Sequence, residues 1–129
     1  MKLSANFSLE EMTKTNTGLP NKPTDYVIRN LRLLCKNVLQ PAREKLGKPI
    51  IVTSGYRSTV VNQRVGGVPT SQHVKGEASD IVCKNREDTK RLFDILKETD
   101  FDQLINENNL SWIHVSYNRY ENRHQIFSL

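Results

Sequence analysis

Two short segments of this chain carry the residue types best suited to chemistry. They are SQHVKGEASDI, Ser71–Ile81, and WIHVSY, Trp112–Tyr117. Between them they supply two imidazoles and one carboxylate, from His73, His114 and Asp80. A catalytic zinc ion takes nitrogen or oxygen ligands from three side chains and leaves its fourth tetrahedral position to water. The two segments therefore predict a catalytic zinc site.

The spacing and alternation of these segments explain how the three side chains can meet. His73 and Asp80 are too far apart for one helical turn, and Gly76 between them lets the chain bend. Asp80 and His114 each lie within an alternating, β-like run, where successive side chains point to opposite faces of a strand. Taken singly, a histidine in a strand is usually a hydrogen-bonded structural residue. The combination favours a metal, and we expect Asp80 and His114 to meet across a sheet.

The same residues resemble the signature of the M15 zinc peptidases. This family includes D-Ala-D-Ala carboxypeptidases and dipeptidases and the L-alanyl-D-glutamate endopeptidases of phage lysins. The segments 54–58, SGYRS, and 61–73, VNQRVGGVPTSQH, are similar to subgroup A of this family, the D-Ala-D-Ala carboxypeptidase-like proteins. The resemblance covers residues 7–117 and is carried by Ser71, His73, Gly76, Ala78, Asp80, Trp112 and His114.

The resemblance implies a fold, a cofactor and a substrate. The fold is α+β, a small antiparallel sheet that carries the zinc site with helices packed on one side, as in hedgehog and D-Ala-D-Ala peptidase-like domains. We expect residues 1–129 to form a single zinc peptidase-like domain with one Zn²⁺ ion. The implied substrate is the stem peptide of peptidoglycan, cut at D-Ala-D-Ala or at L-Ala-D-Glu. The sequence does not separate these two bonds.

Residues beside the ligands are candidates for contact with the substrate. A β-branched run at 49–54 leads to Arg57, whose planar guanidinium can grip a carboxylate or a peptide oxygen in two places. Its position alone is that of an ordinary surface residue, and the resemblance gives Arg57 a catalytic role beside the metal, where it polarises the substrate. Ser71 and Gln72 directly precede the first ligand and are expected to touch substrate. A local backbone hydrogen bond is nevertheless the commoner fate of such a serine.

A hydrolytic zinc site also needs a general base for the attacking water. Several M15 relatives place an acidic residue three positions before the last histidine ligand, but Ser111 stands there in this chain. The nearest upstream acid is Glu107, at the end of the preceding expected strand, and we predict that it is the catalytic base. Asp102 is the alternative. In the resulting scheme the base takes the proton of the zinc-activated water and returns it to the leaving amine, while Arg57 and zinc share the developing negative charge.

The remaining sequence predicts the elements that position these residues. Ser8 followed by Glu11 is a capping box that starts a short helix. Apolar residues at three-to-four spacing over 26–46 indicate the longest amphipathic helix, and Pro41 predicts a kink or break near Gln40. We further expect helices over 59–64 and after an Asn85 cap, a buried strand over 49–54, and strands over 78–83, 101–107, 111–117 and 124–127.

Composition limits the classes of protein and partner. A chain of 129 residues with 36% hydrophobic and 26% charged residues is typical of a soluble globular domain. No apolar run approaches the ~18–20 residues of a membrane span, and residues 1–11 lack the apolar core of a signal peptide. The net charge of +5 favours an anionic polymer, either nucleic acid or the acidic cell wall. No dense basic stripe and no Cys/His finger are present, so nucleic acid is the weaker interpretation.

The sequence also suggests the oligomeric state, the partners and the location of the protein. We expect a monomer with no nucleic-acid partner and no membrane insertion. It would be made in the cytoplasm and act on the cell wall, in the periplasm, if it is a phage-type lysin that passes through a separate pore. Cys35 and Cys83 lie in apolar contexts and are predicted to be buried and unbridged.

Two other functions compete with peptide hydrolysis. A zinc-containing wall-binding or phage structural module without catalysis is favoured by Ser111, which stands where an acid is usual. A nuclease built on histidine and aspartate draws only on the positive charge, and it would need magnesium rather than zinc.

Overall fold

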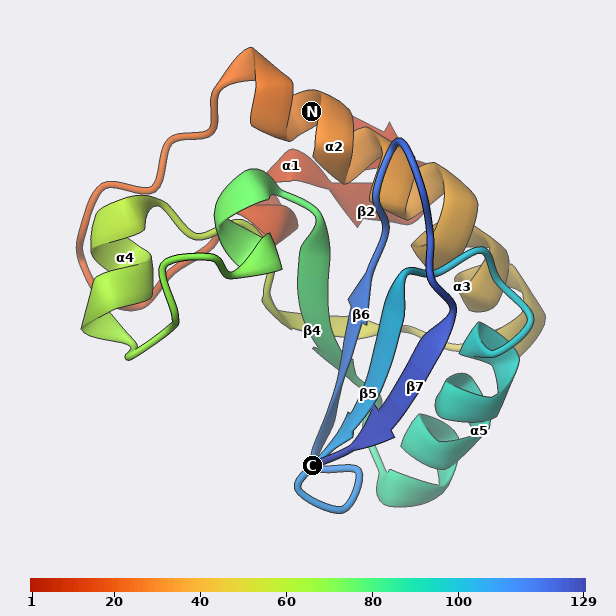
Figure 1. Cartoon of the computed structure of the whole chain (residues 1–129). Helices are drawn as coiled ribbons and strands as arrows, with labels where there is room; N and C mark the ends of the chain where they lie inside the picture. Colours follow the sequence, from red (N-terminus) through yellow and green to blue (C-terminus); the bar gives the residue numbers. More distant parts are fainter.

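The computed structural model describes all 129 residues and has a five-stranded sheet as its centre. The sheet order is β3-β4-β6-β5-β7, and Figure 1 shows the strands β4–β7 side by side. The strands are β3 (Ile51–Ser54), β4 (Ala78–Val82), β5 (Gln103–Glu107), β6 (Trp112–Ser116) and β7 (Gln125–Ser128). The predicted antiparallel pairing is confirmed for β3, β4, β6 and β5.

The last strand departs from the antiparallel pattern. β7 pairs with β5 in parallel, with Gln103 opposite Gln125. The reason lies in the direction of β6, which ends where β5 begins. The connection after β6 turns the chain back at that end, so β7 runs opposite to β6 and therefore parallel to β5. The sequence predicted a strand here, over 124–127, but not its direction.

Helices cover one face of this sheet. α2 (Asp25–Leu34), α3 (Gln40–Leu46) and α5 (Arg86–Leu96) gather along one side, whereas α4 (Thr59–Arg64) lies apart, near the segment that leads into β4 (Figure 1). The capping side chains Ser8, Thr24, Ser58 and Asn85 each accept a hydrogen bond from the first turn, as helix starts require. The predicted capping box of Ser8 and Glu11 opens α1 (Leu9–Met12), which follows a small hairpin of β1 (Lys2–Ser4) and β2 (Phe7–Ser8). No helix is long and apolar enough to cross a bilayer.

The long helix predicted over 26–46 stays helical but changes its winding. α2 passes into a π-helical turn, Cys35–Leu39, and this turn passes into α3. Pro41 lacks an N–H and its ring crowds the carbonyl of Asn37, four residues earlier. A wider turn just upstream relieves both problems without ending the helix. The predicted irregularity therefore lies directly before Gln40.

The core fills the space between these helices and the sheet. Ile81, Leu104, Ile113 and Val115 of the sheet are fully buried against helical side chains. The helical side of this core contains Leu31, Leu34, Val38, Leu39, Leu92 and Leu96. Each fully buried aliphatic side chain stabilises the fold by about 1.5–3 kcal/mol. Both cysteines are buried and free, as predicted. This packing leaves the opposite face of the sheet for Asp80 and His114.

The prediction of a buried strand over 49–54 was wrong about burial. β3 is an edge strand that pairs only with β4, and the side chain of Ile51 is 47% exposed. A β-branched run fits a central or an edge strand equally well, because β propensity reflects the packing of a pleated surface. Position within the sheet is decided by the other strands.

Gly76 provides a test of how the first ligand is placed. It has φ +75° and ends the short 3₁₀ turn Gln72–Lys75, and an added Cβ would lie 2.8 Å from the carbonyl oxygen of Val27. We expect Gly76→Ala to lower the free energy of unfolding by roughly 2–4 kcal/mol, from left-handed backbone strain plus the clash. Gly47→Ala is the control, since Gly47 has φ +69° and open space around it, and should cost only about 1–2 kcal/mol. Urea unfolding measures both, and equal losses would contradict a role for the contact with Val27.

Candidate metal centre

Three elements bring the predicted ligands together. His73 lies in the 3₁₀ turn, Asp80 in the middle of β4 and His114 in the middle of β6. Asp80 and His114 are direct cross-strand partners, so the prediction that they meet across the sheet is confirmed. One ligand atom from each of the three residues lies within 4.8 Å of the other two. The chain therefore holds two imidazoles and one carboxylate at a single point.

The hydrogen bond on the far side of His73 fixes its protonation. Its Nδ1 lies 2.7 Å from the carbonyl oxygen of Gly55, which can only accept. Nδ1 therefore carries the proton, and in the neutral ring Nε2 carries a lone pair. That nitrogen lies 3.2 Å from Oδ1 of Asp80. His73 is almost completely buried, so this orientation is held by packing as well.

His114 is fixed in the same way through a side chain. The Oδ2 of Asp102, an acceptor when ionised, lies 3.0 Å from Nε2 of Gln72, so the amide of Gln72 is oriented with its nitrogen toward Asp102. The amide oxygen of Gln72 then lies 3.1 Å from Nε2 of His114, which must donate. The other nitrogen, Nδ1, carries the lone pair and lies 3.2 Å from Oδ1 of Asp80.

Nε2 of His73, Nδ1 of His114 and Oδ1 of Asp80 therefore face one another as three acceptors, with no donor among them. Nη2 of Arg57 lies 3.4 Å from the other carboxylate oxygen of Asp80, Oδ2, and this adjacent positive charge favours the ionised form of Asp80. Asp80 is consequently an ionised carboxylate facing two nitrogen lone pairs, an arrangement that calls for a cation. Two imidazoles and one carboxylate are a ligand set that suits zinc and leaves one coordination position for water or substrate. The residues present fit the ion predicted from the sequence.

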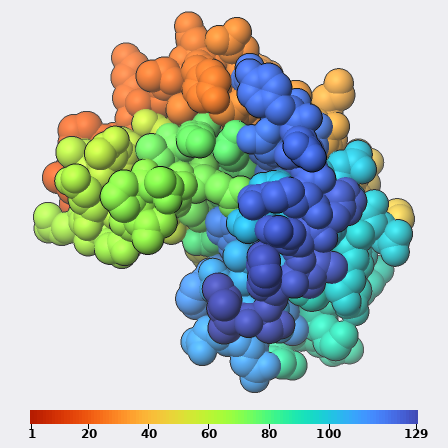
Figure 2. All heavy atoms as spheres, viewed as in Figure 1, coloured from red at the N-terminus to blue at the C-terminus, as the bar shows by residue number.

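The ligand cluster faces an open groove. The groove has a volume of about 410 Å³ and lies between the turn that carries His73 and the free face of β5 and β6. Figure 2 shows this hollow between the green segment around residues 60–80 and the blue C-terminal part of the chain. Side chains of Ile105, Glu107 and Trp112 form its wall beside His114. A polymer chain can therefore reach the ligand cluster from solvent.

Comparison with known proteins agrees with this geometry. Residues 5–116 match the protein family described as Peptidase M15. The chain belongs to the peptidase M15 family. A stretch of 78 residues, 59% of the M15 chain, is 35% identical to the zinc D-Ala-D-Ala carboxypeptidase of Streptomyces albus G and covers 31% of that protein. The matched part is thus less than a third of the length of this relative.

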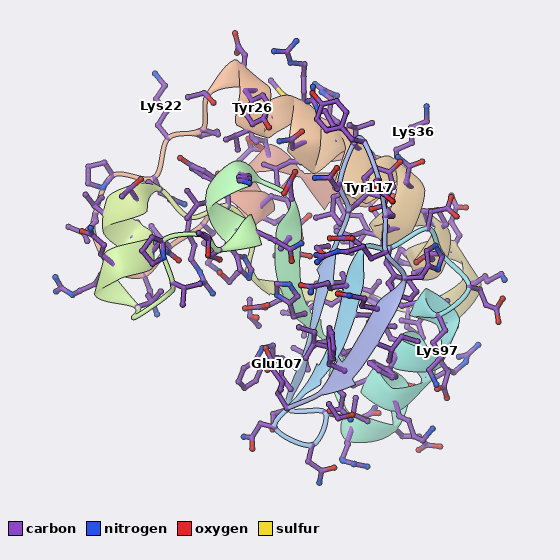
Figure 3. The ribbon with its side chains drawn as sticks, viewed as in Figure 1. Lys22, Tyr26, Lys36, Lys97, Glu107 and Tyr117 are labelled. Atoms are coloured by element: carbon purple, nitrogen blue, oxygen red, sulfur yellow. The ribbon has the colours of Figure 1, made fainter.

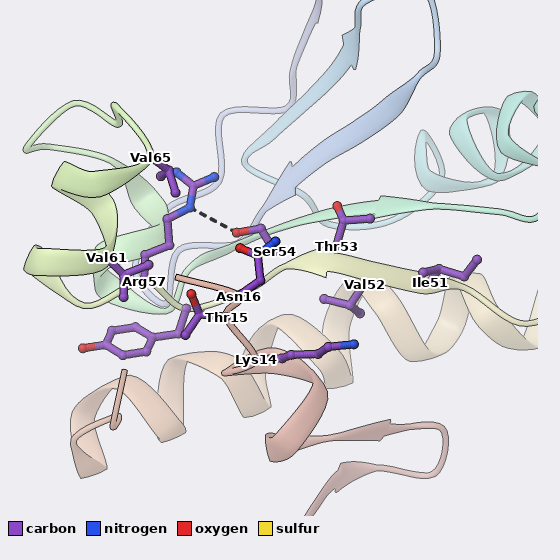
Figure 4. Close-up of a pocket in the computed structure, with 11 residues that line it drawn as sticks. Lys14, Thr15, Asn16, Ile51, Val52, Thr53, Ser54, Arg57, Val61 and Val65 are labelled. Atoms are coloured by element: carbon purple, nitrogen blue, oxygen red, sulfur yellow. Dashed lines mark hydrogen bonds between the residues drawn. The ribbon is translucent and has the colours of Figure 1, made fainter. Parts of the chain in front are cut away.

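Arg57 of the M15 chain lies beside the ligand cluster. Its Nη2 lies 3.4 Å from Oδ2 of Asp80, the carboxylate oxygen turned away from the two histidines. Its Nε donates to Oγ of Ser54 at 3.1 Å, and its Nη1 lies 3.4 Å from Oδ1 of Asn62. Figure 4 shows Arg57 hydrogen-bonded to Ser54. Both residues line a second hollow, which has a volume of about 450 Å³ and runs along the edge strand β3. Arg57 lines both this hollow and the groove of the M15 chain.

The two candidate bases have different positions in the M15 chain. Glu107 lines the groove, at the end of the sheet where the hairpin between β5 and β6 begins (Figure 3). Ile105 is the cross-strand partner of His114, so Glu107 is two residues further on the same face. Such diagonal neighbours lie about 7–8 Å apart, within reach of a long side chain or a bridging water. Glu107 is therefore the candidate with access to the groove.

Asp102 lies beneath the groove and is already paired. It is 3% exposed, and its two oxygens accept hydrogen bonds from Nε and Nη2 of Arg123 at 2.9 Å and 2.8 Å. These bonds from Arg123 hold the pKa of Asp102 below its usual value. Asp102 does not line the groove, so the structure gives it a supporting position behind Gln72.

Ser71 and Gln72 line the groove but also form internal hydrogen bonds. The hydroxyl of Ser71 accepts from the backbone N–H of His73 at 3.2 Å, the local bond expected of such a serine. Gln72 connects His114 to Asp102. A contact of either residue with substrate stays a prediction.

Sequence patterns missed the partners that orient the histidines. The carbonyl of Gly55 comes from the loop after β3, and Arg123 comes from the connection before β7. No local signal identifies either residue, because a main-chain carbonyl has no side-chain signature and Arg123 looks like any surface arginine.

Proposed function

We propose that this M15 chain is a zinc-dependent peptidase that hydrolyses a peptide bond in the stem peptides of peptidoglycan. The observation that carries the proposal is the convergence of three acceptors, His73, Asp80 and His114, at the floor of an open groove. Membership of a peptidase family and the likeness to a zinc D-Ala-D-Ala carboxypeptidase support it. The positive net charge also suits an enzyme that works on an acidic wall.

Two residues of the groove, Glu107 and Arg57, have defined roles in the proposed reaction. When bound, zinc supplies a Lewis acid that acidifies water and polarises a carbonyl group. Glu107 accepts the proton of the attacking water and delivers it to the leaving amine, which general acid–base catalysis requires of one positioned carboxylate. Arg57 faces the ligand cluster and stabilises the negative charge that develops on the carbonyl oxygen.

The two hollows that meet at Arg57 suggest how a peptide lies. The groove contains the ligand cluster, and the hollow along β3 continues on the other side of the arginine. A stem peptide can thus extend on both sides of the scissile bond. Cleavage at D-Ala-D-Ala and cleavage at L-Ala-D-Glu both fit this shape.

Mass spectrometry of a muropeptide digest tests the activity and identifies the bond. We expect the zinc-loaded protein to shorten stem peptides, either by one terminal alanine or by separating the peptide after the first L-alanine. Protein stripped with a chelator is the control and should leave every mass unchanged until zinc is restored. Unchanged masses with fully zinc-loaded protein would contradict the proposal.

The second candidate is a zinc-containing wall-binding or phage structural module without catalysis. The observation that favours it is Ser111, a position where M15 relatives often have an acid. In the structure Ser111 belongs to the hairpin turn, and its hydroxyl donates to the carbonyl of Asn108 at 2.7 Å. The same digest separates the two functions, because such a module would co-sediment with peptidoglycan and release no fragment.

A further inference from the structure

A continuous run of hydrogen bonds leads from His114 to the C-terminal tail, residues 117–129. Nε2 of His114 donates to Gln72 at 3.1 Å, and Gln72 donates to Asp102 at 3.0 Å. Asp102 in turn accepts three bonds from Arg123, from its backbone N–H and from Nε and Nη2, at 2.8–2.9 Å. Arg123 lies beyond residues 5–116, the part of the chain that matches the peptidase M15 family.

We propose that Gln72, Asp102 and Arg123 form a positioning relay that fixes the ring of His114 for metal binding. Metal binding then depends on the C-terminal tail, which supplies Arg123. The inference rests on the proposed zinc site, but not on peptidase activity. It gives Gln72 a task other than substrate contact, and it explains why Asp102 is kept as a buried carboxylate behind the groove.

The two histidine ligands differ in how firmly their outer partners are held. The partner of His73 is the main-chain carbonyl of Gly55, whose direction is set by the backbone. The partner of His114 is a side-chain amide, which can rotate and can present either its oxygen or its nitrogen. His114 therefore needs a further group that selects one orientation of Gln72.

Asp102 makes this selection because a carboxylate accepts hydrogen bonds and does not donate them. If the amide of Gln72 were reversed, its oxygen would face Asp102 and its nitrogen would face Nε2 of His114. The proton of His114 would then move to Nδ1, the atom that faces Asp80, and the lone pair for the metal would be lost. The charge of Asp102 thus protects the protonation state that a metal ligand requires.

Arg123 keeps Asp102 ionised and in place. Asp102 is 3% exposed, and an isolated carboxylate at such a site would be costly. The guanidinium of Arg123 satisfies both carboxylate oxygens, and the backbone N–H of Gln125 donates to the carbonyl of Asp102 at 2.9 Å, which ties β7 to the same point. The orientation of His114 consequently depends on the tail.

The zinc dissociation constant, measured by competition with a chelator, tests the relay directly. Gln72→Met keeps the length of the side chain and removes both hydrogen bonds, and we expect zinc to bind about 10- to 100-fold more weakly. Arg123→Ala should weaken binding in the same direction by a smaller factor, and Arg123→Lys should recover part of the loss. Unfolding of the zinc-free proteins, measured in parallel, shows whether a variant has lost its fold instead.

Arg119→Ala is the matched control from the same tail. Arg119 donates from Nε and Nη2 to Oδ1 of Asn30 at 3.1 Å and 2.8 Å and lies over the ring of Tyr26. It forms no hydrogen bond with any residue of the relay. Its loss should loosen the tail and leave the zinc dissociation constant unchanged. An equal loss of affinity in Arg119→Ala and Arg123→Ala would mean that the tail acts by general stability, and the relay would be refuted.

A double-mutant cycle shows whether Arg123 acts through Gln72. Once Gln72→Met has broken the relay, adding Arg123→Ala should cost no further zinc affinity. A full additional loss in the double variant, or a Gln72→Met protein with wild-type affinity, overturns this inference alone. A wild-type protein that takes up no zinc overturns the proposed function together with it, so the two failures are distinguishable.

Discussion

His114→Ala is expected to abolish stoichiometric zinc binding and, with it, cleavage of muropeptides. The substitution removes one of the three acceptors that converge on a single point, and leaves His73 and Asp80 as an incomplete pair. Loss of an outer partner of a metal ligand costs about 10- to 100-fold in affinity, so loss of the ligand itself should cost more. Metal analysis of the purified protein measures the effect.

The chain offers a matched control for this experiment. His124 is exposed, and its ring lies 4.8 Å from the ring of Phe101, away from the ligand cluster. His124→Ala should retain one zinc ion per chain and full activity. If His114→Ala kept its zinc, the ion would be held elsewhere and the proposed centre would be wrong.

Glu107→Gln is expected to keep zinc and to lower turnover by about 100-fold or more, which is the contribution typical of a general base. Gln is nearly the same size as Glu but cannot take up a proton, so the groove should keep its shape. Zinc content and the zinc dissociation constant should match the wild type, because Glu107 is not among the three ligand residues. The digest of a defined muropeptide, followed over time, gives the rate.

Glu121→Gln serves as the control, since this exposed residue lies in the connection before β7 and outside the groove. It removes the same charge from the surface, and activity should not change. Undiminished turnover in Glu107→Gln would remove Glu107 from the mechanism. Asp102 would not be the obvious replacement, because both of its oxygens are held by Arg123.

The hairpin turn that follows Glu107 has a conformation that depends on packing, which the sequence does not show. The predicted strands over 101–107 and 111–117 are separated by only three residues, and the structure has positive φ values at all three, Asn108, Asn109 and Leu110. Asparagine tolerates this region, but a bulky leucine does so only when its surroundings impose it. Leu110 is buried, so packing of the turn decides this conformation. This turn sets the register between β5 and β6, and the register places Glu107 on the same face of the sheet as His114.

Local chemistry was sufficient to predict the ligands and the elements that carry them. Alternation along β4 and β6 requires Asp80 and His114 to project from defined faces, and capping side chains such as Ser8 fix where helices begin. These features depend on neighbours within a few residues, which the sequence lists in order. The α+β class and the group of three candidate metal ligands could therefore be predicted from the sequence and its resemblance to M15 peptidases.

Tertiary structure alone decided which ring nitrogens of His73 and His114 face Asp80. The proton of His73 is placed by the carbonyl of Gly55, and that of His114 by Gln72, Asp102 and Arg123. The edge position of β3 and the parallel direction of β7 likewise depend on strands distant in the chain. Hydrogen bonds between remote segments form only when the register and the loops are set, and no local pattern encodes that register.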